Sequence, residues 1–299
     1  MRNKVLEKES YKKEYKVLKD IIEKKLDEYV PIKYPEEIYQ SMKYSLNAGG
    51  KRLRPIMALE VCKMLSGSFE KAIPTACAIE MLHTQSLIHD DLPCMDNDDY
   101  RRGKLTNHKA FSESTAVLAG DALLSYAPKL IIEKSKLSAN IIMELIREFC
   151  IAAGVDGIIS GQIVDIDSEN KKISSETLDY IHEYKTAKLF ILAIKAGAII
   201  AEGTTKQIQE LEKFAKVFGH AFQIYDDILD EVSTLEELGK TPGKDANTHK
   251  ATYTSIFGLD NAKNKVRLLC TQCCDILENN KMNSIILKGI VSDIMERVC

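Results

Sequence analysis

The proline positions limit the possible folds more than any other feature of this sequence. Seven prolines occur in 299 residues, and none lies between Pro128 and Pro242. A long apolar stretch without proline favours consecutive helices, because proline inside a helix removes a backbone hydrogen bond and clashes with the preceding turn. Between Ile208 and Leu229 the apolar side chains recur every three or four residues, as one buried helix face requires. We therefore predict an all-α fold.

The polar breaks between the expected helices are mostly short. Two longer breaks, residues 91–113 and 232–249, are charged or rich in Gly, Lys and Thr, and neither has the composition of an interdomain linker. The sequence therefore predicts one domain over residues 1–299. The expected helices span residues 10–28, 35–47, 52–65, 70–90, 114–135, 138–152, 156–166, 175–201, 205–231, 250–279 and 282–298.

The charge balance excludes several classes of partner. There are 41 basic and 44 acidic side chains, so a net charge of -3 gives no reason to expect nucleic acid or an anionic membrane. The charged N-terminal segment is unlike a signal peptide, and no window approaches the ~18 uninterrupted apolar residues of a membrane span. We expect a cytoplasmic protein without stable membrane insertion. Cys270, Cys273 and Cys274 lack a second ligand pair for zinc, and we assign them to a helical core.

Two clusters of acidic residues follow or interrupt apolar helices. In the first, Asp90, Asp91 and Asp96 surround a predicted helix end that Pro93 breaks. The second lies within the predicted helix 205–231, where the spacing puts four polar residues on one face: Gln223, Asp226, Asp227 and Asp230.

These clusters have two interpretations. Acidic residues are common on solvated helix faces, and either cluster alone fits that description. Carboxylates beside apolar segments are costly unless something compensates their charge, and divalent cations do so. Mg²⁺ takes one or two carboxylates per ion and fills its other positions with water and phosphate oxygens. Two facing clusters would therefore clamp a phosphorylated ligand through bridging metal ions.

Basic residues could supply the rest of a phosphate site. The segment Gly49–Pro55 puts a Gly-Gly turn before Lys51, Arg52 and Arg54, where backbone amides and cations can converge on one anion. Further cations follow the first acidic cluster or lie in the second half of the chain: Arg101, Arg102, Lys185, Lys240, Lys244 and Lys250. Each lysine alone also fits a solvated surface.

Taken together, these motifs resemble the trans-isoprenyl diphosphate synthases, in particular the bacterial farnesyl and plastid-type geranylgeranyl diphosphate synthases. The two aspartate patterns are weak separately, but together with the glycine-rich basic segment they are very specific. The matching strings occur in family order over nearly the whole chain. They are GGKRLRP (49–55), HTQSLIHDDLPCMDNDDYRRGKLTNH (83–108), LAGDALL (118–124), GQIVD (161–165), KTAKLF (185–190), FQIYDDILD (222–230), LGKTPGKD (238–245) and KATY (250–253).

The resemblance implies a helical bundle around a deep apolar cavity, usually in a homodimer, with the aspartates at the cavity mouth. It implies three Mg²⁺ ions, which Mn²⁺ could replace: two held by Asp90, Asp91 and Asp96, and one by Asp226 with Asp227 and Asp230. Lys185 would join these aspartates in catalysis. The allylic diphosphate would contact Arg101, Lys185, Thr186, Gln223, Lys240 and Lys250. Isopentenyl diphosphate would contact Lys51, Arg54, His83 and Arg102.

The expected reaction joins isopentenyl diphosphate to an allylic diphosphate, dimethylallyl or geranyl, to give mainly farnesyl diphosphate. In the family, the residue five positions before the first aspartate lies near the cavity floor, and here that residue is Gln85 instead of a bulky side chain. Ser86 beside it is small. Geranylgeranyl diphosphate is the alternative product. The chain also differs from relatives in Ala251, which replaces a hydroxyl residue, and in its C-terminal end, where a further basic residue is usual.

Three other functions would share part of this pattern. A non-catalytic synthase subunit would have lost the aspartate clusters, whereas both are present here. A class I terpene cyclase seldom carries GGKRLRP, because it does not bind isopentenyl diphosphate. A helical metal-dependent phosphohydrolase typically adds histidine ligands, and only His83 and His89 lie near an acidic cluster. A prenyltransferase fits the sequence best.

Overall fold

The computed structural model describes residues 2–232 and 251–298, with side chains from Glu7 onward, and it is helical nearly throughout. This confirms the all-α prediction. The longer helices are α1 (Arg2–Tyr29), α2 (Glu36–Leu46), α3 (Leu53–Ser66), α4 (Ile73–Asp90), α6 (Glu113–Lys134), α7 (Ala139–Ala153), α8 (Ile158–Asp167), α9 (Ser175–Ile181), α10 (Lys188–Ile200), α11 (Thr205–Val232), α15 (Leu259–Asn279) and α16 (Ile285–Arg297).

Three expected helices differ from the structure in extent. The first begins earlier than expected, at Arg2. The expected helix 175–201 consists of α9, a π-helical turn η2 (His182–Ala187) and α10. The C-terminal part of 250–279 is divided into α14 (Tyr253–Phe257) and α15 by Gly258, whose φ of 82° favours glycine and ends a helix.

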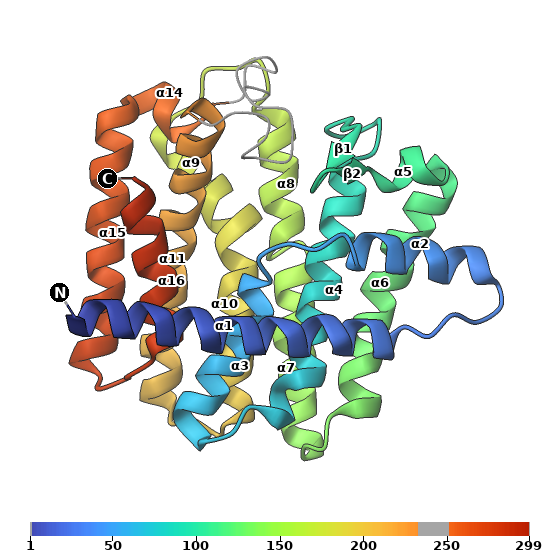
Figure 1. Cartoon of the computed structure of the whole chain (residues 1–299). Coiled ribbons are helices and arrows are strands. Elements are labelled where there is room, and N and C mark those ends of the chain that lie inside the picture. Colours follow the sequence, from blue (N-terminus) through green and yellow to red (C-terminus); the bar gives the residue numbers. More distant parts are fainter. Residues whose placement is uncertain (1, 233–250, 299) are drawn as a thin grey trace.

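The long break after the first acidic cluster contains local structure that the sequence did not predict. A two-stranded hairpin, β1 (Tyr100–Arg101) and β2 (Lys104–Leu105), pairs antiparallel, and the short helix α5 (Asn107–Ala110) follows it. A short 3₁₀ turn, η1 (Glu70–Ala72), precedes α4. The hairpin lies at the same end of the bundle as α14 (Figure 1).

Most of the buried hydrophobic side chains form one contiguous cluster that runs from Tyr11 in α1 to Val298. Helix α4 packs against α3 and α6, α10 packs against α3 and α11, and α1 crosses the front of the bundle (Figure 1). The apolar face expected for α11 is buried, because Phe214 and Phe218 have no exposed surface. The core positions the ends of α4 and α11, which carry the two aspartate clusters.

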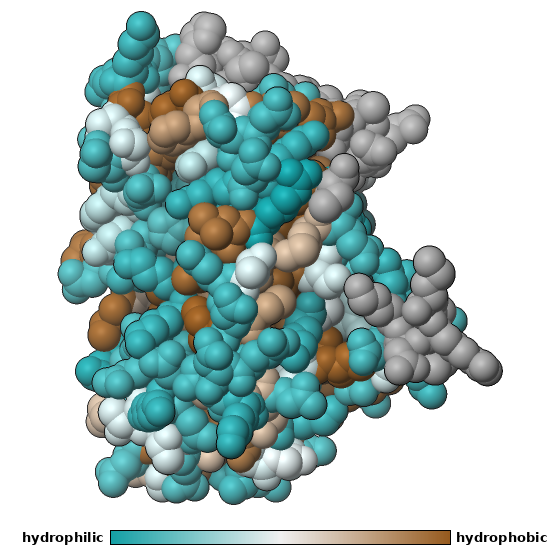
Figure 2. Space-filling view, turned by 90° about the vertical axis from the view of Figure 1, so that its left-hand side faces the viewer, coloured by the Kyte–Doolittle hydropathy of each residue, from teal (hydrophilic) through white to brown (hydrophobic). Residues whose placement is uncertain are grey.

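The outer face formed by α15 and α16 is mainly hydrophilic, with hydrophobic side chains scattered over it (Figure 2). The inward side of α15 includes the cysteines assigned to the core. Cys270 and Cys273 are fully buried and Cys274 packs partly against the core. Burial raises the pKa of the Cys270 thiol to about 12, so this group is an inert core side chain.

Candidate active site

The first aspartate cluster is folded onto the end of α4 by backbone hydrogen bonds. The amide of Asp96 donates to the carbonyl of Asp90 over 2.8 Å, and the amide of Asp98 donates to the carbonyl of Asp91 over 3.2 Å. The chain therefore returns to the helix end after Pro93. This brings Asp90 and Asp96 onto the wall of one small cavity, of about 180 Å³.

Asp91 lies differently from its neighbours. Its carboxylate accepts a hydrogen bond of 2.7 Å from Arg101 Nε and pairs with Nη2 of the same guanidinium at 2.6 Å. The side chain is only 4% exposed. Burial raises the pKa of Asp91 to about 6, although the guanidinium acts in the opposite direction. Asp91 therefore orients Arg101, and it lines neither of the two cavities that contain Asp90.

The second cluster divides into a cavity-facing part and a buried part. Asp226 and Gln223 line both the small cavity and a larger one of about 600 Å³. Asp230 is buried and is absent from the described residues that line either cavity. Asp227 reaches only the small cavity.

The carboxylate of Asp227 is held by three neighbours. It accepts hydrogen bonds from the amide of Gln223 at 3.0 Å and from the backbone N–H of Tyr253 at 2.8 Å. His182 Nε2 lies 3.5 Å from the same carboxylate. Thr186 in turn donates to the carbonyl oxygen of the Gln223 side chain. This chain of hydrogen bonds fixes Gln223 next to Asp226.

The larger cavity is amphiphilic. Its polar lining includes Asp90 and Asp226, one from each cluster, together with Arg101 and Lys185, and we call this part of the cavity its mouth. The remaining wall is mostly hydrophobic and comes from α6, α7, α8, α10 and α11: Leu124, Ala153, Ile158, Ile159, Ile163, Ile166, Leu189 and Phe222. A ligand with a charged head and an apolar tail matches this distribution.

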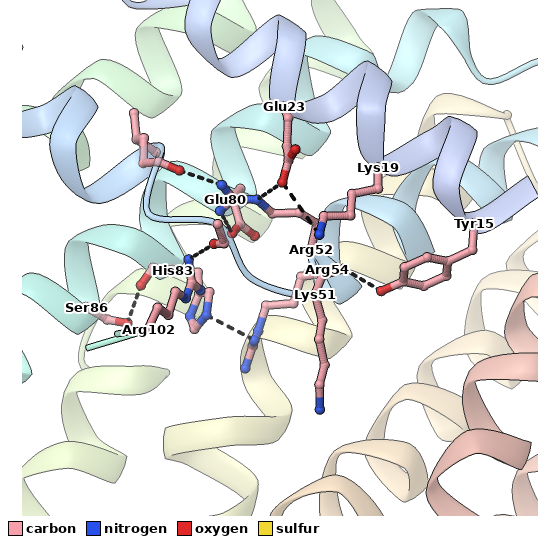
Figure 3. A network of polar contacts seen from close by, with 12 residues as sticks. Tyr15, Lys19, Glu23, Lys51, Arg52, Arg54, Glu80, His83, Ser86 and Arg102 are labelled. Atoms are coloured by element: carbon pink, nitrogen blue, oxygen red, sulfur yellow. Dashed lines mark hydrogen bonds and ion pairs between the residues drawn. The ribbon is translucent and has the colours of Figure 1, made fainter. Parts of the chain in front are cut away.

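The glycine-rich basic segment is held by a buried polar network (Figure 3). Gly49 and Gly50 have φ values of 85° and 121°, which form the turn, and Arg102 donates to the carbonyl of Gly49. Arg52 points toward Glu80, whereas Lys51 and Arg54 extend to the other side (Figure 3). Arg52 therefore has a structural role, whereas Lys51 and Arg54 on either side of it in the sequence are free to point toward a ligand.

Arg54 and His83 meet on the wall of the larger cavity, and Arg102 lines it too. The guanidinium of Arg54 lies over the ring of Phe190 at 4.3 Å, and its Nη1 is 3.4 Å from His83 Nε2. Burial lowers the pKa of Arg54 to about 10 and lowers the pKa of His83 well below its ordinary value. Since arginine has no acceptor, the neutral imidazole accepts this bond at Nε2.

Lys51 does not line the larger cavity. It lies in a neighbouring cavity of about 210 Å³, which is formed by α1, α11 and α16 and is also lined by Tyr15, Tyr225 and Arg297. The hydroxyl of Tyr15 donates to the carbonyl of Lys51 and holds its backbone. Lys51 and Arg54 extend to the same side of the segment (Figure 3) and line neighbouring cavities that share Phe222.

Lys185 and Thr186 lie in the π-helical turn η2, a wide turn of the kind often found at functional sites. Lys185 Nζ donates to Asp165 Oδ2 over 2.6 Å, and Asp165 lines the small cavity beside Asp90 and Asp226. Sequence reasoning gave Asp165 no role. The sequence feature that pointed to the other aspartates applies to Asp165 too, because it is a carboxylate near the end of an apolar helix.

Gln85 and Ser86 line the larger cavity from α4, one turn or more from Asp90. Lys240 and Lys250, expected at the allylic diphosphate, lie outside the described residues.

The donor set at the mouth fits Mg²⁺. Within the described ranges no three His, Cys, Asp or Glu side chains converge on one point. Such a group is unnecessary for this ion, because Mg²⁺ keeps several water or phosphate ligands and binds few carboxylates. Asp90, Asp96 and Asp226 offer hard oxygen donors on the same cavity wall, from both clusters. These three residues would hold the ions.

A helical bundle with two aspartate clusters at the mouth of an amphiphilic cavity defines a class of isoprenoid synthase. Residues 35–292 match the polyprenyl synthetase family, and the chain belongs to it. It is a short-chain trans-prenyl diphosphate synthase with the isoprenoid-synthase fold, and enzymes of this family use Mg²⁺.

Geranylgeranyl and farnesyl diphosphate synthases resemble the chain to a similar degree. It is 47% identical to a geranylgeranyl diphosphate synthase of Cyanophora paradoxa, covering 84% of each chain. It is also 47% identical to a farnesyl diphosphate synthase of Bacillus subtilis, covering 83% of this chain and 85% of the relative. A geranyltransferase of Helicobacter pylori, solved with magnesium and isoprenyl diphosphate, superimposes with a TM-score of 0.78 at 34% identity, covering 87% of this chain and 88% of that one.

Proposed function

We propose that this enzyme condenses isopentenyl diphosphate with dimethylallyl and then geranyl diphosphate, and that farnesyl diphosphate is its main product. One observation carries the proposed length. Gln85 is 9% exposed and lines the larger cavity, whose wall is otherwise mostly hydrophobic. A polar amide on the wall beside the hydrocarbon tail disfavours further elongation.

The two substrates would bind at different parts of the site. The allylic diphosphate would lie between Asp90 and Asp226, with Arg101, Lys185 and Gln223 around it, since these groups share the mouth. Isopentenyl diphosphate would contact Arg54, His83 and Arg102, which line the same cavity nearer α3. Lys51 would assist from the neighbouring cavity. Lys240 and Lys250 remain proposed ligands of the allylic diphosphate.

The chemistry follows from this distribution of charge. Bound Mg²⁺ would neutralise the diphosphate and make it a better leaving group. Lys185 and Arg101 would stabilise the negative charge that develops as the allylic C–O bond breaks. Phe222, Leu189 and the isoleucines of α8 would shield the resulting carbocation from water while the double bond of isopentenyl diphosphate attacks it. The departing diphosphate would take the proton that is lost.

Geranylgeranyl diphosphate is the second candidate product, and one observation favours it. Ser86, a small residue next to Gln85 on the cavity wall, donates a hydrogen bond of 2.9 Å to the carbonyl of His83. Its hydroxyl is thereby satisfied within its own helix, so Ser86 narrows the cavity little. The similar identity to both kinds of synthase supports keeping this alternative.

We also propose that the enzyme is a homodimer, joined through the outer faces of α6 and α7. Large hydrophobic side chains are exposed there: Leu118 is 58%, Ile132 57% and Met143 71% exposed. By length and composition alone, Glu113–Lys134 and Ala139–Asp167 could also cross a membrane, which is weak evidence. A second copy would cover this surface. Analytical ultracentrifugation of wild type and Leu118→Glu tests the proposal, since a wild-type monomer would refute it.

One assay tests the proposed reaction and product. The enzyme is incubated with Mg²⁺, isopentenyl diphosphate and one primer, which is dimethylallyl, geranyl or farnesyl diphosphate, and the products are sized. We expect efficient use of the first two primers and mainly C15 product. If farnesyl diphosphate is extended as readily as geranyl diphosphate, the product is longer than proposed. If no primer is extended, the proposed reaction is wrong.

A further inference from the structure

His89 lies between the cavity wall and helix α6 and makes a polar contact with each. Its Nδ1 is 3.1 Å from the amide nitrogen of Gln85, one turn earlier on α4. Its Nε2 is 3.1 Å from the carbonyl oxygen of Val117 in α6. The nearest carboxylate, Asp121, is 3.9 Å from Nε2, which is too far for a hydrogen bond.

The partners in these two contacts determine which atom donates in each hydrogen bond of the His89 ring. A backbone carbonyl can only accept, so Nε2 of His89 carries the proton and donates to Val117. The –NH₂ of Gln85 can only donate, so Nδ1 of His89 accepts this bond. The amide of Gln85 is therefore anchored along α4, toward the end that carries Asp90.

Helix α6 is shaped to admit this ring. A Cβ atom at Gly120 would lie 2.0 Å from His89 Nε2, so any other residue there must displace the imidazole. Gly120 is buried and does not line the larger cavity. Glycine in a helix interior normally costs stability relative to alanine. Close packing of His89 on α6 is a physical reason for glycine at this position.

We infer that His89 is a positioning residue for product length, which holds the amide of Gln85 against α4 and out of the path of the growing tail. This inference rests on the proposed function of Gln85 at the cavity wall. When the bond to His89 is lost, the amide has no anchor, and its side chain can rotate into the apolar cavity. A free polar amide there opposes entry of a longer chain.

The experiment compares two primers directly. For each variant, kcat/KM is measured with farnesyl and with geranyl diphosphate, and the ratio of the two reports how well the cavity accepts the longer tail. His89→Gln can still donate to Val117 but offers no acceptor near Nδ1, and we expect the ratio to fall by about fivefold, as for one lost hydrogen bond. His89→Asn keeps an acceptor near Nδ1, so this variant should lower the ratio less than His89→Gln does.

Gly120→Ala should lower the ratio as His89→Gln does, because it displaces the ring from outside the cavity. Ser125→Ala is the matched control: Ser125 is exposed on the same helix and its hydroxyl bonds only to carbonyls of that helix. It should leave the ratio unchanged. In a Gln85→Ala background, both His89→Gln and Gly120→Ala should have no further effect on the ratio.

A second measurement reads the same contact without substrate. In a long-range ¹H–¹⁵N spectrum of the imidazole nitrogens, His89 should be the Nε2–H tautomer, and Gln85→Ala should shift its Nδ1 signal. An Nδ1–H tautomer would overturn the inference. Unchanged primer ratios in His89→Gln and Gly120→Ala would overturn it too, as would equal effects in the Gln85→Ala background. Failure of the wild type to extend geranyl diphosphate would instead refute the proposed function.

Discussion

Arg52 and Glu80 form an ion pair of 2.6 Å in which neither side chain is more than 2% exposed. Arg52 also donates to the carbonyl of Leu46, and its Nε is 3.7 Å from Glu23. Its backbone is left-handed, with a φ of 55°, directly before α3. The pair therefore fixes the turn from which Lys51 and Arg54 extend.

Removing one partner of this pair should strongly destabilise the protein. Arg52→Met leaves the Glu80 carboxylate buried without its partner, and we expect a loss of about 3–5 kcal/mol in the free energy of unfolding. Chemical denaturation measures this change. Lys24→Ala, which removes an exposed partner of Glu28, should change the stability little. An Arg52→Met variant as stable as Lys24→Ala would show that the pair does not hold the segment.

The aspartates at the cavity mouth should be needed for turnover and not for folding. Asp90→Ala or Asp226→Ala removes an oxygen donor expected to hold Mg²⁺, so kcat should fall by orders of magnitude, about 10²-fold or more. The helical circular dichroism should stay nearly unchanged. Titration with Mg²⁺ is the control. Wild-type turnover by either variant at saturating Mg²⁺ would mean that the metal ligands are assigned wrongly.

The different positions of the cations predict different kinetic effects when each is removed. Lys51→Ala and Arg54→Ala should mainly raise the KM for isopentenyl diphosphate, whereas Lys185→Ala should act on the allylic substrate. Arg54 should have the larger effect of the first two, because it lines the larger cavity and Lys51 does not. Initial rates with each substrate varied in turn measure these constants. If Lys185→Ala instead acted on isopentenyl diphosphate, and Lys51→Ala and Arg54→Ala on the allylic substrate, the two diphosphate sites would be assigned the wrong way round.

The sequence was sufficient for those features that depend on local spacing. The face of α11 and the position of Asp90 at the end of α4 follow from periodicity and from Pro93. The pairing of Asp91 with Arg101, and of Lys185 with Asp165, depends on how a hairpin and two helices meet, which spacing does not encode. For the same reason, neighbours in sequence can line different cavities, as Lys51 and Arg54 do.

The buried environment of His83 predicts a dependence of stability on pH. Burial, reinforced by Arg54, lowers the pKa of His83 in the folded protein, whereas the unfolded chain keeps an ordinary value near 6.5. Below that pH the unfolded state binds a proton that the folded state does not. Stability is therefore complete above about pH 6.5 and falls as the pH drops, by less than about 1.4 kcal/mol per unit.

Denaturation of wild type and His83→Gln from pH 7.5 to 5 checks this. The variant should lose less stability than the wild type across this range, because glutamine does not titrate. The substitution His108→Gln is a useful comparison, because burial, reinforced by Lys109, also lowers the pKa of that histidine. Parallel pH profiles for wild type and His83→Gln would contradict the prediction.

Gln85 should control how long the product becomes. Its side chain lines the larger cavity from α4, five residues before Asp90, and five residues of helix rise about 7.5 Å, comparable to one or two isoprene units. Gln85→Ala removes the amide and its bond to His89 together, so the cavity deepens and the geranylgeranyl fraction should increase. Gln85→Tyr fills the same space and should suppress that fraction. Product sizing after reaction with geranyl diphosphate measures both. If neither substitution alters the product distribution, Gln85 is not part of the cavity floor, and another side chain limits the tail.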